Sequence, residues 1–361
     1  MYNFISGSNN KLVPCDGPMS ANNKIVMSLW TKPLFSDAFY FSSIEDFFAF
    51  WTLSVQQASK VYGWNRMSLY TDDLGLELLS KLGLRFYRSY TSLNRLSDYD
   101  ASLWALGKIE TYRLQTAPFL HIDHDVFLWQ RLPCHIENAS LVAQSPEYFM
   151  YGDKAAWWYD IERFVENFNL PYSWQAAIEK KGLQTSVNAG IMGGQDYSTL
   201  RGVASDAFYI LNDSRNKPVW DEIHDKGFAN TVLEQYTFAR QAEFNKKEIS
   251  YLFPSGYEPS FGKEIGYTHL VAGYKKEPDL RDMVWAEIQQ NYPEYLPRIH
   301  DTANYLRSLI EQKNNISMFL KSSGMDSIEV NTSFLFRTSN CKVCTLVILL
   351  SSFFIKPIFQ F

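Results

Sequence analysis

The stretch that decides the fold is PFLHIDHDVFLW, residues 118–129. Apolar residues on both sides of two acidic residues predict a buried strand that presents Asp123 and Asp125 at its end. In an extended chain the two carboxylates point to the same side, roughly 6.5–7 Å apart. Carboxylates that close repel each other unless a cation lies between them or one of them is protonated. Such oxygen ligands suit Mg²⁺ or Mn²⁺, which also bind phosphate oxygens.

The chain before this stretch alternates between predicted strands and helices. Strands are expected at residues 24–31, 67–71 and 85–88, and helices at residues 44–62, 74–82 and 101–115. Ser43 is expected to cap the first helix, with Asp46 as its capping-box partner, and Gly83 to end the second helix. This alternation predicts an α/β fold, in which a mostly parallel sheet is flanked by helices on both faces.

Polar and aromatic residues lie at the predicted carboxyl ends of the first two strands. Ligands bind beyond these ends in sheets of this kind. A nucleotide base and ribose are therefore expected near Trp30, Thr31 and Asp72, with the diphosphate at Asp123. Two alternatives stay open: a buried core position for Trp30, and a helix N-cap for Asp72.

Residues 187–194, VNAGIMGG, form the second informative segment. Gly190, Gly193 and Gly194 let the backbone turn sharply or approach a ligand closely, and the Asn188 amide can both donate and accept hydrogen bonds. The glycine spacing matches neither a P-loop nor a dinucleotide-binding fingerprint.

Three other regions complete the expected organisation. Residues 148–181, rich in Trp, Tyr and Phe, are predicted to form a helical insertion, and the 227–243 helix carries Glu234 and Gln235. His269 lies in a late apolar segment, and imidazole is a good ligand for Mn²⁺ among oxygens. The expected domains are an irregular segment at 1–23, the α/β domain at 24–300, and a helix with an apolar tail at 301–361.

Together these motifs resemble glycosyltransferases with the GT-A fold. They are most similar to an uncharacterised bacterial family related to glycogenin-like and galactosyltransferase-like retaining enzymes. The resemblance rests on the Trp104–Lys108 helix, the Asp-x-Asp strand, Asn188-Ala-Gly190, Glu234-Gln235 and His269-Leu-x-x-Gly-Tyr-Lys275.

The resemblance implies a role for each matching residue. Asp123, Asp125 and His269 would bind the metal, and Lys275 or Lys276 the diphosphate.

Asn188, with Gly190, Gly193 and Gly194, would line the pocket for the donor sugar. Glu234 and Gln235 would face the reacting sugar. Lys108 would reach the aspartates or the donor. His124 departs from the family pattern, which has a small residue between the aspartates, so donor geometry and an additional ligand stay open.

The implied function is metal-dependent transfer of a sugar from a UDP-sugar to a hydroxyl acceptor, which could be a glycan, a lipid or a protein, with retention of configuration. Two alternatives stay open. One is a non-catalytic binding protein for nucleotide-sugars or glycans on the same scaffold, and the other is a metal-dependent nucleotidyltransferase.

The amino-acid composition limits which binding partners and which cellular location are expected. Lys and Arg number 34 against 39 Asp and Glu, which gives a formal charge of −5 and no basic signature of nucleic-acid binding. Four cysteines are too few for a disulfide scaffold. No secretory signal is evident, so a cytoplasmic location is expected. The apolar run at 345–355 is shorter than the roughly 20 residues of a spanning helix, so weak membrane contact is expected at most.

Overall fold

The computed structural model describes residues 12–15, 24–36, 41–153, 160–175, 182–257 and 262–322. The chain divides into two compact units, Met1–His300 and Asp301–Phe361. The apolar run at 345–355 and the Cys341/Cys344 pair lie outside the described residues.

A seven-stranded sheet forms the centre of the first unit, with strand order β3-β2-β1-β4-β7-β6-β8. β1–β2, β1–β4, β2–β3 and β6–β8 pair in parallel, whereas β7 is antiparallel to both of its neighbours. The strands are β1 (Lys24–Leu29), β2 (Met67–Thr71), β3 (Arg88–Tyr90), β4 (Phe119–Ile122), β6 (Leu141–Met150), β7 (Leu183–Gly194) and β8 (Ile249–Tyr251). The predicted α/β fold with a mostly parallel sheet is confirmed, with β7 as the antiparallel exception.

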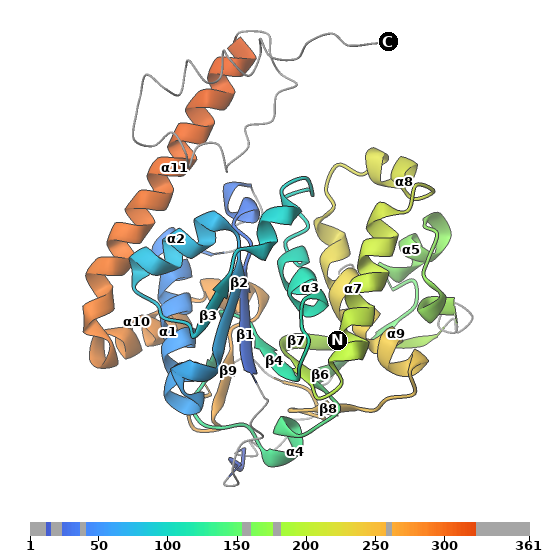
Figure 1. The fold of residues 1–361 in the computed structure, drawn as a ribbon, viewed down its shortest axis with the longest axis horizontal. Helices are drawn as coiled ribbons and strands as arrows, with labels where there is room; N and C mark the ends of the chain where they lie inside the picture. The colour runs from blue at the N-terminus through green and yellow to red at the C-terminus, as the bar shows by residue number, and fades with distance from the viewer. Residues whose placement is uncertain are drawn as a thin grey trace. The chain divides into compact units, whose positions relative to one another are not determined.

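Helices cover both faces of this sheet. α1 and α2 lie on one side of it, and α3 and α7 lie on the other (Figure 1). The helices are α1 (Ile44–Tyr62), α2 (Asp73–Leu82), α3 (Leu106–Arg113), α4 (Cys134–Glu137), α5 (Ile161–Asn167), α7 (Tyr197–Asn212), α8 (Lys217–Glu222), α9 (Thr237–Phe244), α10 (Pro278–Asn291) and α11 (Leu296–Ser322). None of the helices that the structure describes is long and apolar enough to cross a membrane.

Local signals account for the start of α1. The Ser43 side chain accepts a hydrogen bond of 3.0 Å from the Asp46 amide, as an N-cap does. The Asp46 carboxylate does not complete a capping box. It accepts a 2.8 Å hydrogen bond from the Trp285 indole and lies 3.0 Å from the Arg281 guanidinium, and these contacts join α10 to α1.

The stretch at 118–129 is two strands rather than one. β4 belongs to the main sheet, whereas β5 (Val126–Leu128) leaves it and pairs with β9 (Tyr267–His269) in a separate two-stranded ribbon. The chain turns between them, because the Val126 amide donates a 3.0 Å hydrogen bond to the Asp123 carbonyl. Ser54 of α1 holds this turn through a 2.7 Å hydrogen bond to the Val126 carbonyl. The two aspartates therefore project from a turn and not from an extended strand.

Other predicted boundaries shift as well. The helix expected at 101–115 is confined to α3, β3 begins only at Arg88, and β6 continues through Met150 into the expected insertion. Within 148–181 the described helical segments are α5 and a 3₁₀ turn at Tyr172–Trp174, while residues 154–159 and 176–181 lie outside the described residues. The helix expected at 301–320 begins earlier, at Leu296.

A disulfide that the sequence did not predict joins Cys15 to Cys134. The short segment around Cys15 also contacts the end of the β5–β9 ribbon, since the Leu12 amide donates to Ile265 and the Cys15 amide to Leu132. The cytoplasmic location stays a prediction, and this disulfide is the feature that argues against it.

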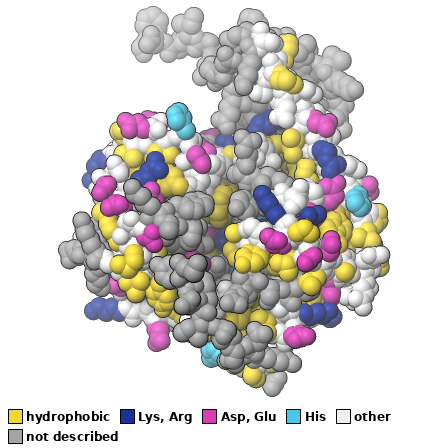
Figure 2. Space-filling model, turned by 180° about the vertical axis from the view of Figure 1, so that it is seen from behind, with side chains coloured by type: hydrophobic (Ala, Val, Ile, Leu, Met, Phe, Trp, Pro, Cys, Tyr) yellow, Lys and Arg dark blue, Asp and Glu magenta, His cyan; other side chains and the backbone are white. Residues whose placement is uncertain are grey.

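Acidic and basic side chains are interspersed on the face shown in Figure 2, without a broad basic area among the described residues drawn there. This distribution agrees with the formal charge of −5.

Candidate metal centre

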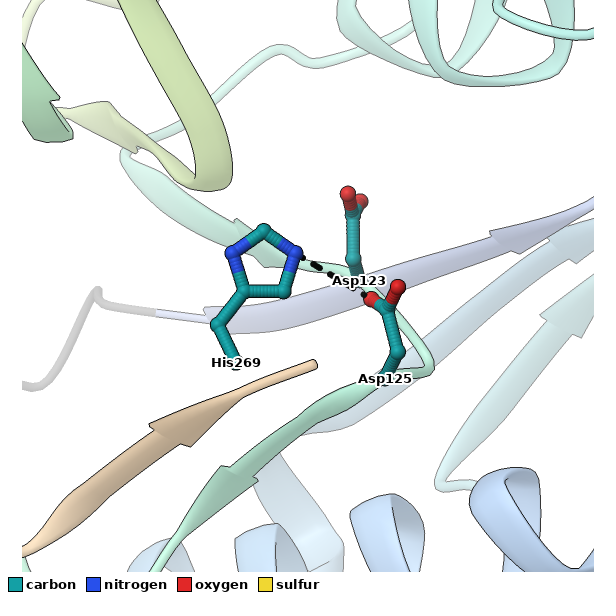
Figure 3. A group of neighbouring side chains, drawn as sticks. All are labelled: Asp123, Asp125 and His269. Atoms are coloured by element: carbon teal, nitrogen blue, oxygen red, sulfur yellow. Dashed lines mark ion pairs between the residues drawn. The ribbon is translucent and has the colours of Figure 1, made fainter. Parts of the chain in front are cut away.

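Asp123, Asp125 and His269 converge on one point. One potential ligand atom from each lies within 4.8 Å of the other two, and the three side chains point toward one another (Figure 3). Asp123 follows β4, Asp125 precedes β5, and His269 ends β9. The β5–β9 register pairs Val126 with His269, which brings the imidazole beside the aspartates. The convergence predicted from residues 146 positions apart in the chain is therefore present.

The hydrogen bonds of His269 set its tautomer. Its Nδ1 lies 2.7 Å from Oε1 of Gln144, an oxygen that also accepts a 2.7 Å hydrogen bond from the Tyr267 hydroxyl. Because a carboxamide oxygen only accepts, Nδ1 carries the proton and Nε2 keeps its lone pair. Burial lowers the pKa of His269 to about 4, so the ring is neutral at neutral pH.

The free lone pair of His269 faces an oxygen that also needs a partner. Nε2 lies 3.5 Å from Oδ1 of Asp125, which is buried and accepts no hydrogen bond within the described part of the chain. Two electron-pair donors facing each other without a proton between them fit a cation. The residues present therefore fit a divalent metal ion held by two oxygens and one nitrogen.

The charged side chains around the centre also favour a bound cation. Lys108 Nζ lies 3.0 Å from Asp123 and 2.9 Å from Glu234, and Lys275 Nζ lies 2.6 Å from Asp125. When all three carboxylates are ionised, the two ammonium groups leave one uncompensated negative charge at the site. Burial, opposed by Lys108, raises the pKa of Asp123 to about 7. Burial by itself would raise the pKa of Asp125, but Lys275, His269 and His124 together outweigh burial, so the net shift is downward.

Glu234 lies beside this centre in a role that the sequence did not predict. It is fully buried on a π-helical turn, Val232–Tyr236, a geometry frequent at functional sites. Its carboxylate accepts a 2.6 Å hydrogen bond from Tyr112 and pairs with Lys108, so it holds the lysine on Asp123. The predicted contact with the reacting sugar stays a prediction. Gln235 follows on the same turn and is half-buried. The expectation that Lys108 reaches the aspartates agrees with the structure.

Gly190 lies against the metal centre. A Cβ atom on Gly190 would collide with Oε1 of Gln144 and Nδ1 of His269, so only glycine leaves room for this hydrogen-bonded pair. Asn188 accepts a 3.1 Å hydrogen bond from the Gly190 amide and donates one of 3.0 Å to Glu147. The segment thus supports the histidine directly.

Gly193 and Gly194 lie farther along β7, within the sheet. A Cβ on Gly193 would meet the Phe119 carbonyl, and Gly194 has a φ of +130° and lies against the Ser140 carbonyl. Close strand packing explains both glycines without a donor sugar.

At the ends of β1 and β2, contacts within the protein account for the predicted nucleotide residues. Asp72 is the N-cap of α2, accepting 2.8 Å hydrogen bonds from the Gly75 amide and from the amide and hydroxyl of Thr31. Trp30 is buried in a hydrophobic cluster with Leu93 and other residues of the α3 region. Trp30 is thus a buried core residue and Asp72 a helix N-cap, which are the two alternatives that the sequence left open.

His124, the residue that departs from the family pattern, packs against α1. Its ring stacks on Trp51 at 5.3 Å and 8°, with Phe47 at 5.3 Å and Phe41 at 5.4 Å. Burial lowers the pKa of His124 to about 3, which keeps the ring neutral. An aromatic pocket formed by Phe41 and two residues of α1 therefore accommodates the bulk of His124, outside the Asp123/Asp125/His269 ligand group.

Sequence reasoning missed Gln144, the residue that orients His269. A signal was present, because Leu141–Gln144 reads as an apolar strand that becomes polar at Gln144. A polar residue at the end of a buried strand is a candidate for contact with a site.

We expect Gln144→Leu to weaken Mn²⁺ binding by about 10–100-fold, because the histidine loses the acceptor that fixes its tautomer and ring orientation. Isothermal titration calorimetry with Mn²⁺ measures the change. Gln115→Leu is the matched control, since Gln115 is a buried amide that bonds to the Thr111 carbonyl instead. Equal Mn²⁺ affinity in the two variants would show that Gln144 does not orient the ligand.

Comparisons with known proteins identify a family for this chain and a solved structure that is similar to it. A model described as "Family of unknown function (DUF6734)" matches residues 23–302. The crystal structure of mouse xyloside xylosyltransferase 1, apo form, is similar at 10% sequence identity and a TM-score of 0.36, covering 69% of this chain and 98% of that chain. A likeness at this level says nothing about activity. No curated protein matches the chain significantly.

Proposed function

We propose that this chain, which belongs to the DUF6734 family of unknown function, is a metal-dependent glycosyltransferase. Its proposed donor is a nucleotide-sugar, specifically a UDP-sugar. The observation that carries the proposal is the convergence of Asp123, Asp125 and His269 at the carboxyl end of β4 in an α/β sheet. Ligands bind at such ends.

Charge supports a diphosphate as the group that is bound. With its three carboxylates ionised, the described centre carries one excess negative charge, and a divalent ion would change this to one positive charge. A nucleotide-sugar diphosphate carries two negative charges and complements it. When bound, Mn²⁺ or Mg²⁺ would neutralise charge on the departing diphosphate.

The protein's own residues would do the rest. Asp123, Asp125 and His269 hold the ion, while Lys108 and Glu234 fix the orientation of Asp123. Lys275, or Lys276 beside it, would bind the phosphate oxygens. We propose an acceptor hydroxyl on a glycan, lipid or protein, and retention of configuration from the family resemblance.

The test is a panel of nucleotide-sugars with the purified protein, with and without Mn²⁺. We expect UDP binding by calorimetry that requires Mn²⁺, and slow hydrolysis of one donor to free sugar, since water can replace the acceptor. Metal-independent UDP binding would contradict the site. Binding without turnover of any donor would favour a binding protein, and pyrophosphate release from a nucleoside triphosphate a nucleotidyltransferase.

A further inference from the structure

Lys275 occupies a defined position at the metal centre. Its ammonium lies 2.6 Å from Oδ2 of Asp125 and 5.2 Å from the centre of the Phe41 ring, and its side chain is 15% exposed. The carboxylate holds the charge, and the aromatic face adds a cation–π contact. The lysine therefore has a specific binding place inside the site.

The segment that carries Lys275 is loosely packed. It is a 3₁₀ turn, Ala272–Lys276, in which none of the residues is buried. No described atom lies within 4 Å of the point where a Cβ on Gly273 would stand. A lysine on such a turn can leave Asp125 without disturbing the core.

The same carboxylate serves the lysine and the proposed metal. Oδ2 of Asp125 bonds to Lys275, while Oδ1 faces Nε2 of His269. A divalent ion on Asp125 would lie within a few ångströms of the ammonium and repel it strongly in this buried setting. A diphosphate beside the ion would give the lysine a new anionic partner and remove the repulsion.

We propose that Lys275 is a built-in counter-ion of Asp125 that opposes metal binding until a diphosphate draws it away, so that metal and nucleotide bind cooperatively. This inference rests on the proposed function for the identity of the anion. Linkage requires the effect to be reciprocal: UDP raises the affinity for Mn²⁺ by the same factor as Mn²⁺ raises the affinity for UDP.

The test is Lys275→Met, which keeps the length of the side chain and removes its charge. We expect the variant to bind Mn²⁺ alone about tenfold more tightly than the wild type, because the competing charge is gone. UDP should raise the Mn²⁺ affinity of both proteins, because the diphosphate itself attracts the ion, but by about tenfold less in the variant than in the wild type. Calorimetric titration of Mn²⁺, with and without saturating UDP, measures both quantities.

Two further variants serve as a control for the lost charge and as a test of the aromatic contact. Lys217→Met removes an exposed lysine on α8 that pairs with Asp221, and it should leave Mn²⁺ binding unchanged with and without UDP. Phe41→Leu removes the aromatic face under the lysine and should tighten Mn²⁺ binding in the same direction as Lys275→Met, but less.

Failure of the inference is distinguishable from failure of the proposed function. If Lys275→Met binds Mn²⁺ alone no more tightly than the wild type, or if UDP raises its Mn²⁺ affinity as much as it does in the wild type, the counter-ion role is wrong. If the wild type binds no UDP while Lys275→Met still binds Mn²⁺ more tightly, the counter-ion role holds and the nucleotide donor is wrong.

Discussion

Asp125→Asn is expected to lower Mn²⁺ affinity at least 100-fold and donor turnover by about a thousandfold, because the metal supplies several kcal/mol of charge stabilisation. Asp125 is the most central ligand. It is 3% exposed, one of its oxygens faces His269, and its backbone carbonyl accepts a 3.1 Å hydrogen bond from Leu270. An amide of the same shape keeps the turn and removes only the charge.

The measurement is Mn²⁺ titration by calorimetry, with turnover of the best donor as the second readout. Asp73→Asn is the control, since Asp73 is an exposed aspartate in the first turn of α2. A melting temperature close to that of the wild type would show that the variant is folded. Retention of Mn²⁺ binding by a folded Asp125→Asn protein would refute the site as described.

Lys108→Met is expected to destabilise the protein by about 3–5 kcal/mol, the range for removing one partner of a buried ion pair. The Lys108 side chain is 11% exposed and lies between Asp123 and Glu234. Coulombic attraction to these carboxylates raises the pKa of Lys108 despite the opposing effect of burial, so the lysine is charged. Methionine would leave the buried carboxylate of Glu234 and the half-buried carboxylate of Asp123 without a cation between them.

Urea unfolding monitored by tryptophan fluorescence measures the loss. Mn²⁺ should restore more stability to Lys108→Met than to the wild type, because the ion supplies the missing positive charge beside Asp123. The double variant Lys108→Met/Glu234→Leu should recover part of the loss, since an apolar pair replaces the ion pair. A loss below about 1 kcal/mol in the single variant would show that water or a rearrangement compensates the carboxylates.

Much of the fold could be predicted because its signals are local. Ser43 and Asp72 cap helices α1 and α2 by bonding to amides three residues away, and Gly83 ends α2 in a left-handed conformation. The metal ligands were also predictable, since few side-chain types bind Mg²⁺ or Mn²⁺ and two of them lie two residues apart.

Predictions that depended on distant partners were less successful. From the sequence, Glu234 could be a substrate contact or a solvent-facing polar residue, and only the folded chain shows that it is buried against Lys108 and Tyr112. Gly190 reads as a ligand-binding glycine, yet the atoms that require it belong to Gln144 and His269.

Local patterns of apolar residues, caps and acidic pairs were thus enough to indicate an α/β fold and to name the three candidate ligands. The folded chain alone revealed the turn that separates β4 from β5, the antiparallel direction of β7 and the pairing of Lys275 with Asp125. Helix and strand signals arise from neighbours along the chain, whereas charge compensation in a buried site arises from side chains up to 150 positions apart, as with Asp125 and Lys275.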